Sequence, residues 1–157
     1  MQNIKSGLLF RPRMDMDTLM PKLSEDARPY AERISEVFDA PFARYLGLEI
    51  ESASLDEVVC TMKMQPFMLN SMGRMHGGVI YSLIDHTFAI ISNMTRDGTG
   101  QSIEVKYYRP GNSDLRCVAK PINLSRSLGM YDVRVYSTEG KLIASAVCTG
   151  FVIRRTE

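Results

Sequence analysis

The spacing of apolar residues changes character near residue 48, which separates a helical beginning from a mostly β remainder. Over residues 17–38, charged residues alternate with Leu, Ile, Val and Phe at spacings typical of one or two amphipathic helices, interrupted by Pro21 and Pro29. A short helical turn is expected to begin at Pro41 and to end at Gly47. The pattern therefore predicts an N-terminal helical extension.

Alternation of apolar and polar positions predicts six strands after residue 47. The first two, residues 48–55 and 58–64, are expected to form a hairpin. Turn residues then separate four further strands, at 101–108, 114–124, 130–137 and 142–153. Because the links between consecutive strands are short, we expect an antiparallel meander.

The run from residue 78 to 94 is too long for a strand and is apolar on all sides. A helix without a polar face is expected to lie inside the protein. Six strands that curl around one buried helix form an α+β hot-dog fold, which we expect over residues 42–157. Residues 1–41 then form an arm, irregular up to residue 16, and a helical extension.

Composition supports a single folded domain without a general affinity for nucleic acid. The chain has 157 residues, of which 45% are hydrophobic, and a net charge of +1. The last third is more basic, with nine Lys or Arg and five Asp or Glu over residues 101–157, a net charge of +4. This excess indicates either solvated strand faces or a groove for an anionic ligand.

The cysteines favour a reduced compartment. Cys60, Cys117 and Cys148 are odd in number, lack metal-ligand spacing and lie in apolar stretches. The apolar segment before Arg11 is too short for a secretory signal, and the run at 78–94 contains too many polar residues for a membrane span. We therefore expect a cytoplasmic protein with no membrane attachment and no metal site.

Asp85 is the one carboxylate in the apolar run. No Lys or Arg lies three or four residues away in that run, and removing an unpaired carboxylate from water is costly. Asp85 is therefore either half of an ion pair with a strand or another subunit, or a general base or nucleophile. We favour the second interpretation.

His76, Gly77 and Gly78 mark the entry to this helix. The free N–H groups of a first helical turn can bind the oxygen of a carbonyl under attack, and glycines allow a substrate to approach the backbone closely. Asn70 could donate its amide to the same carbonyl, or could instead form an Asx turn.

The distance between these groups predicts a shared site. Nine residues of helix place His76 and Asp85 about 13 Å apart along the axis, beyond reach of one small carbonyl. If both act on one substrate, Asp85 must come from a second chain, as in an antiparallel pairing of two such helices across a dimer axis. Whether such dimers pair again into tetramers is left open.

The spacing Asn70-x-x-Gly73-x-x-His76-Gly77-Gly78, with Asp85 nine residues after the histidine, resembles hot-dog acyl-CoA thioesterases of the phenylacetate-pathway (PaaI) type, related to 4-hydroxybenzoyl-CoA thioesterase. The resemblance implies hydrolysis of an acyl- or aryl-CoA without a cofactor. It also implies that the Gly77 N–H polarises the thioester, that Asn70 lies near it, that His76 orders the loop and that Asp85 of the partner activates water or attacks directly.

Three further residues have candidate roles outside the Asn70 to Asp85 motif. The resemblance makes Ser102 a candidate substrate-binding residue, since some members carry Ser or Thr near the start of this strand. Arg126 could replace the basic residue that family members often place in the turn before the fifth strand, near the CoA phosphates, or could simply face solvent. His86 points away from Asp85 and is expected to form a structural hydrogen bond.

Two other functions are compatible with the same fold. A non-catalytic sensor or carrier of acyl-CoA would have no need of a buried aspartate. An enoyl thioester hydratase would require an acid and a base on one face, which Asp85 and His86 do not provide.

Overall fold

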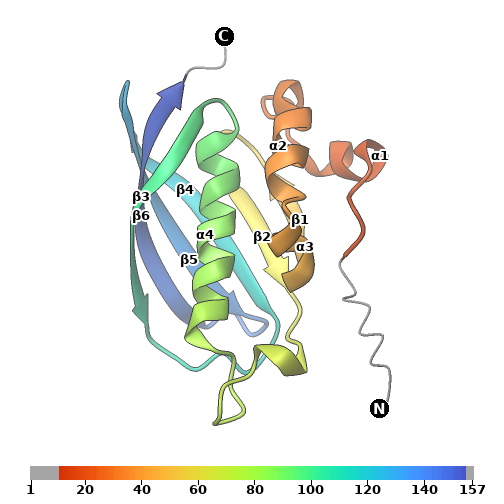
Figure 1. The fold of residues 1–157 in the computed structure, drawn as a ribbon, viewed down its shortest axis with the longest axis vertical. Helices are drawn as coiled ribbons and strands as arrows, with labels where there is room; N and C mark the ends of the chain where they lie inside the picture. The colour runs from red at the N-terminus through yellow and green to blue at the C-terminus, as the bar shows by residue number, and fades with distance from the viewer. Residues whose placement is uncertain (1–10, 155–157) are drawn as a thin grey trace, which may run out of the picture.

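The structure, a computed structural model, describes residues 11–154; the arm expected at residues 1–10 lies outside them. Short helices come first and one long helix follows the first hairpin (Figure 1). The helical elements are α1 (Met16–Leu19), η1 (Met20–Lys22), η2 (Arg28–Tyr30), α2 (Ala31–Phe38), α3 (Pro41–Leu46), η3 (Pro66–Met68) and α4 (Gly77–Asn93). The strands are β1 (Leu48–Ala53), β2 (Val58–Met62), β3 (Asp97–Tyr107), β4 (Leu115–Leu124), β5 (Leu128–Ser137) and β6 (Leu142–Arg154).

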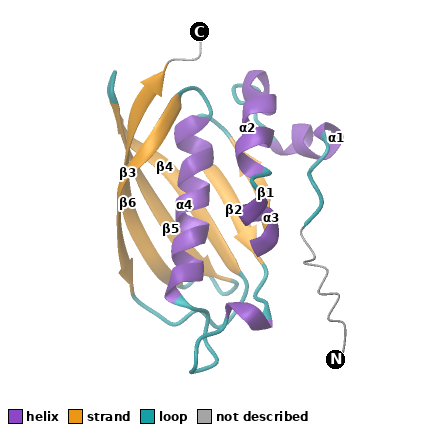
Figure 2. Ribbon diagram, in the orientation of Figure 1, coloured by secondary structure: helices purple, strands orange, loops and turns teal. Residues whose placement is uncertain are grey.

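The strands form one antiparallel sheet in the order β1-β2-β4-β5-β6-β3, with α4 lying across one face (Figure 2). The alternating side chains of β2, β4, β5 and β6 that face α4 are buried, which explains the period of two in the sequence. Together they form one hydrophobic core with the helices. The expected α+β hot-dog fold is confirmed.

The position of β3 differs from the expected meander. The strands β4, β5 and β6 do follow one another across the sheet, but β3 pairs with β6 at the far edge and β4 returns beside β2. The link at residues 108–114 passes below the ends of β5 and β6 (Figure 1). Seven residues can reach about 23 Å when extended, which is enough to cross three strand spacings of about 5 Å, so a short link does not require adjacent strands.

The helix α4 is not enclosed on all sides, contrary to the expectation from its composition. The sheet covers one side and α2 lies along a second, but Gly78, Tyr81 and Asp85 are exposed. These residues are three and seven positions apart and thus share one face. Residues 11–154 therefore leave a stripe of α4 uncovered.

The N-terminal extension packs into the same core. Leu19, Ile34 and Phe38 are completely buried. The prolines begin helical turns here, as Pro21 and Pro29 stand near the starts of η1 and η2. Pro41 begins α3 and Gly47, with φ +68°, ends it, as predicted.

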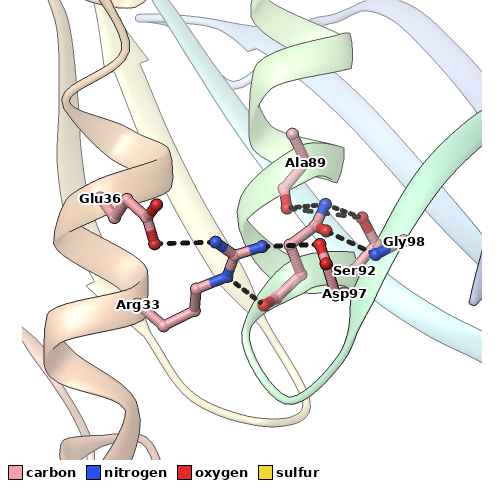
Figure 3. A network of polar contacts seen from close by, with 7 residues as sticks. Arg33, Glu36, Ala89, Ser92, Asp97 and Gly98 are labelled. Atoms are coloured by element: carbon pink, nitrogen blue, oxygen red, sulfur yellow. Dashed lines mark hydrogen bonds and ion pairs between the residues drawn. The ribbon is translucent and has the colours of Figure 1, made fainter. Parts of the chain in front are cut away.

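A polar network holds α2 against the end of α4 (Figure 3). The guanidinium of Arg33 donates to the carbonyl oxygen of Asn93 at 3.3 Å and pairs with Asp97 at 3.1 Å and with Glu36 at 2.7 Å. The side chain of Asn93 in turn accepts from the N–H of Gly98 at 3.0 Å. The network therefore joins α2, the C-terminus of α4 and the start of β3.

The cysteines are buried free thiols, as expected. Burial raises the pKa of the Cys60 and Cys148 thiols to about 12 and raises that of Cys117 as well. These side chains are therefore unreactive core residues.

Candidate active site

The loop that leads into α4 is organised by Asn70. Its side-chain oxygen accepts from the N–H groups of Met72 at 2.9 Å and Arg74 at 3.2 Å, which confirms an Asx turn. Gly73 takes a positive φ of +69° in this turn, a conformation that favours glycine. Within residues 11–154 the NH₂ group of Asn70 has no hydrogen-bond partner, so it stays free to donate.

His76 caps the helix. Its backbone is extended, and its Nδ1 accepts from the N–H of Gly78 at 2.9 Å, so Nδ1 carries no proton in this arrangement. A side chain on Gly78 would come within 3.1 Å of this ring nitrogen, which explains why a glycine suits the position. The second glycine, Gly77, presents its carbonyl oxygen to the hydroxyl of Tyr107 at 2.9 Å.

The backbone N–H of Gly77 is left without an acceptor among the described residues. Gly77 and Asn70 line the same surface cavity, of about 330 Å³, at the N-terminus of α4. Met72, Arg74, Tyr107 and Arg109 also line it. The free N–H at the positive end of the helix dipole makes this cavity suited to a partly negative oxygen.

Asp85 lies two turns further along α4 and does not line this cavity. The carboxylate makes no hydrogen bond or ion pair in the part of the chain that the structure describes, so the expected alternative of a salt bridge to a strand of the same chain is wrong. Partial burial raises the pKa of Asp85 above its usual value of 3.8. The structure thus contains a carboxylate that faces outward and is costly to ionise.

The other candidates occupy separate places. Ser102 is exposed in β3 opposite Thr149 and does not line the cavity, while Arg126 is exposed in the turn between β4 and β5. Their roles in substrate binding stay predictions. His86 is structural, as expected: its Nε2 lies 3.2 Å from the carbonyl oxygen of Phe38.

The basic excess of the C-terminal third is mostly spread over strand faces. Five of its basic side chains form ion pairs with neighbouring carboxylates, namely Lys106, Arg116, Lys120, Arg134 and Lys141. For these residues the interpretation as solvated strand faces is confirmed. Arg109 differs, since it lines the cavity beside Gly77.

Tyr107 and Arg109 also line the cavity, although the sequence pattern did not indicate them as candidates. They lie about thirty residues after Gly77, at the end of a strand and in the link that follows it. An aromatic residue that ends the strand after a helix with two N-terminal glycines is the available signal, but it does not reveal which glycine the ring covers.

Residues 11–154 contain no group of three or more His, Cys, Asp or Glu that could hold a metal ion. Among the described helices, none combines the length and the hydropathy needed to cross a bilayer.

Known proteins resemble this chain in sequence and in fold. Residues 72–144 match the model of the thioesterase superfamily. A protein of Deinococcus radiodurans is 32% identical over 130 residues, which are 81% of this chain and 84% of the relative. The acyl-coenzyme A thioesterase PaaI of Escherichia coli is 29% identical over 105 residues, 65% of this chain and 75% of PaaI.

Two solved structures share the fold. The structure of E. coli PaaI, from the phenylacetic acid degradation operon, superposes with a TM-score of 0.78 and 26% identity, covering 85% of this chain and 97% of PaaI. A hypothetical thioesterase of Streptococcus pneumoniae with coenzyme A has a TM-score of 0.65 and 26% identity, covering 70% of this chain and 88% of the other.

The fold, with two glycines in the first turn of α4 after the His76 cap, and these comparisons thus define a hot-dog thioester hydrolase. The chain belongs to the thioesterase superfamily, and the resemblance to its PaaI type is confirmed.

Proposed function

We propose that this protein hydrolyses an acyl- or aryl-CoA thioester to a free acid and coenzyme A. The observation that carries the proposal is that Gly77 and Asn70 line one cavity at the N-terminus of α4, and that within residues 11–154 neither the Gly77 N–H nor the Asn70 NH₂ has an acceptor. The names of two similar proteins support the substrate class, since one is an acyl-coenzyme A thioesterase and the other was solved with coenzyme A.

The two donors would act on the carbonyl oxygen of the thioester. When a nucleophile adds to the carbonyl carbon, negative charge develops on this oxygen, and donors already aimed at it need no reorganisation. The positive end of the α4 dipole lies behind the Gly77 N–H and favours the same charge. Hydrogen bonds from Gly77 and Asn70 therefore stabilise the transition state more than the bound substrate.

Asp85 would supply the base or the nucleophile. As a base, its carboxylate takes a proton from water while the oxygen of that water bonds to the carbonyl carbon. The tetrahedral intermediate then breaks its C–S bond, and the departing thiolate receives the proton from Asp85. As a nucleophile, Asp85 would itself displace the thiolate and form an anhydride that water hydrolyses. Both routes yield the same acid and thiol.

The carboxylate that acts on the cavity belongs to a second copy of the chain. The helix itself separates Asp85 from Gly77 of the same chain by about 12 Å. The open stripe of Gly78, Tyr81 and Asp85 lets two α4 helices approach, and an antiparallel arrangement would bring each Asp85 to the helix start of the other. The proposed active site is thus formed by two chains and occurs twice in a homodimer.

A hydrolysis screen tests the proposal. Aromatic, medium-chain and long-chain CoA thioesters are incubated with the protein, and the released thiol is measured. We expect release with at least one class of substrate, and loss of release in Asp85→Asn but not in Asp56→Asn, a matched change in an exposed turn. Binding of these thioesters without any thiol release would contradict hydrolysis and would favour a sensor or carrier.

A further inference from the structure

The peptide bond between Gly77 and Gly78 is held from both sides. Its carbonyl oxygen accepts from the Tyr107 hydroxyl at 2.9 Å, and its N–H donates to Nδ1 of His76 at 2.9 Å. One partner directly precedes α4, while the other ends β3, thirty residues later. A peptide plane with both polar ends bonded cannot rotate without breaking a hydrogen bond.

Rotation of this plane would change the direction of the neighbouring donor. The Gly77 N–H belongs to the preceding peptide, which joins the held plane at the Gly77 α-carbon. Glycine has no side chain to restrict its backbone, so the direction of this N–H depends on what holds the two planes that meet at Gly77. The preceding plane is held at the His76 carbonyl oxygen, which accepts from the N–H groups of Val79 at 2.9 Å and Ile80 at 3.2 Å, and the Tyr107 hydroxyl holds the following plane. The Tyr107 hydroxyl therefore restrains a backbone that glycine leaves permissive.

The ring of Tyr107 also lies against Gly77. A Cβ on this glycine would be 3.5 Å from Cζ of the ring, which is ordinary van der Waals contact. Burial, and then the neighbouring Tyr81, raise the pKa of the Tyr107 hydroxyl, so it keeps its proton at neutral pH and remains a donor. At neutral pH the Tyr107 hydroxyl can therefore donate to the Gly77 carbonyl oxygen.

We propose that Tyr107 is a positioning residue for thioester hydrolysis: its hydroxyl fixes the Gly77–Gly78 peptide and thereby aims the Gly77 N–H into the cavity. The proposal rests on the proposed function. A donor that is already aimed lowers the barrier because it pays no reorganisation when charge develops. Loss of the Tyr107 hydroxyl is expected to lower kcat and not to change KM, because the bound substrate is held mainly by contacts to its other parts.

The kinetic test is Tyr107→Phe, which removes one oxygen and keeps the ring. One net hydrogen bond corresponds to a fall in kcat of about threefold to tenfold, with KM changed by less than about twofold. Tyr136→Phe removes the same atom from β5, at a place outside the cavity, and is expected to leave both constants unchanged. Thermal unfolding of each variant checks that the fold is retained.

A second measurement does not depend on turnover. With ¹⁵N-glycine labelling, the amide resonances of Gly77 and Gly78 should shift in Tyr107→Phe, and hydrogen exchange at Gly78 should become faster. If the resonances and the exchange rate stay unchanged, the hydrogen bond from Tyr107 does not hold the Gly77–Gly78 peptide, and the proposal is overturned. Changed resonances with an unchanged kcat would overturn the positioning role while hydrolysis stands. If the wild-type protein hydrolyses no thioester, the proposed function and this role fail together, although the resonances still report the contact.

Discussion

Asp85 combines two properties that rarely occur in one surface carboxylate. It is exposed on the open stripe of α4, yet the surrounding chain raises its pKa because desolvation disfavours the charged form. In the described part of the chain, no cation compensates for this cost. A structural role within one chain would have provided a partner, so the unpaired carboxylate points either to a chemical role or to an ion pair with another subunit.

The change Asp85→Asn is expected to separate activity from stability. Hydrolysis should fall by about 10²- to 10⁴-fold, the usual contribution of a general base. The unfolding temperature at pH 7 should stay equal or rise. A raised folded-state pKa means that ionised Asp85 opposes folding above that pKa, and asparagine removes this penalty. Steady-state kinetics and thermal unfolding measure the two effects, and a marked loss of stability would contradict the argument.

At the scale of elements, His86 links α4 to the end of α2. Its Nε2 lies 3.2 Å from the carbonyl oxygen of Phe38, and since a carbonyl only accepts, Nε2 carries a proton and donates it. Burial lowers the pKa of His86 from 6.5 to about 4, against smaller raising effects of the Phe38 carbonyl and Asp39. Together with the Arg33 network, this contact joins the N-terminal extension to α4.

This link predicts how stability depends on pH. Between pH 6.5 and about 4, the unfolded chain binds a proton at His86 that the folded chain does not bind. The free energy of unfolding therefore falls by about 2 to 3 kcal/mol as the pH is lowered through this range. Urea denaturation at pH 7.0 and 4.5 measures this fall. His86→Gln keeps an N–H donor but cannot titrate, and should lose most of the dependence. An equal fall in both proteins would assign it to other groups.

At the scale of the whole molecule, the single chain keeps the candidate catalytic groups apart. It brings Asn70 and Gly77 into one cavity and leaves Asp85 two turns away on an open face. The sheet and α2 cover the other sides of α4, so a partner has one direction from which to approach.

Mixing two inactive variants tests the shared site. Asp85→Ala and Asn70→Ala should each be inactive alone, whereas a hybrid dimer contains one site with an intact Asn70, Gly77 and partner Asp85. Random exchange in an equal mixture should restore about a quarter of the wild-type activity, because half of the dimers are hybrids with one intact site. Mass measurement of differently tagged chains verifies exchange. Exchange without recovered activity would rule out a site formed by two chains.

Local patterns predicted much of this architecture. The six strands, the long helix, its start near His76 and the helix turn from Pro41 to Gly47 all follow from periodicity or from residues adjacent in the chain. The place of β3 was predicted wrongly, because strand order depends on which edges pair and not on the length of the link. The sequence predicted that α4 is buried on all sides, which is wrong, because the apolar composition of a helix does not reveal which of its faces other elements cover.

The sequence by itself determined the elements and the candidate chemical groups, Asn70, Gly77 and Asp85, because spacing along a helix and a loop is a local property. Tertiary structure alone decided that Tyr107 holds the Gly77 peptide, that His86 bonds to Phe38 and that one face of α4 stays open. Those contacts join residues thirty or more positions apart. Their geometry results from the packing of the helices on the whole sheet, and a short stretch of sequence carries no information about that packing.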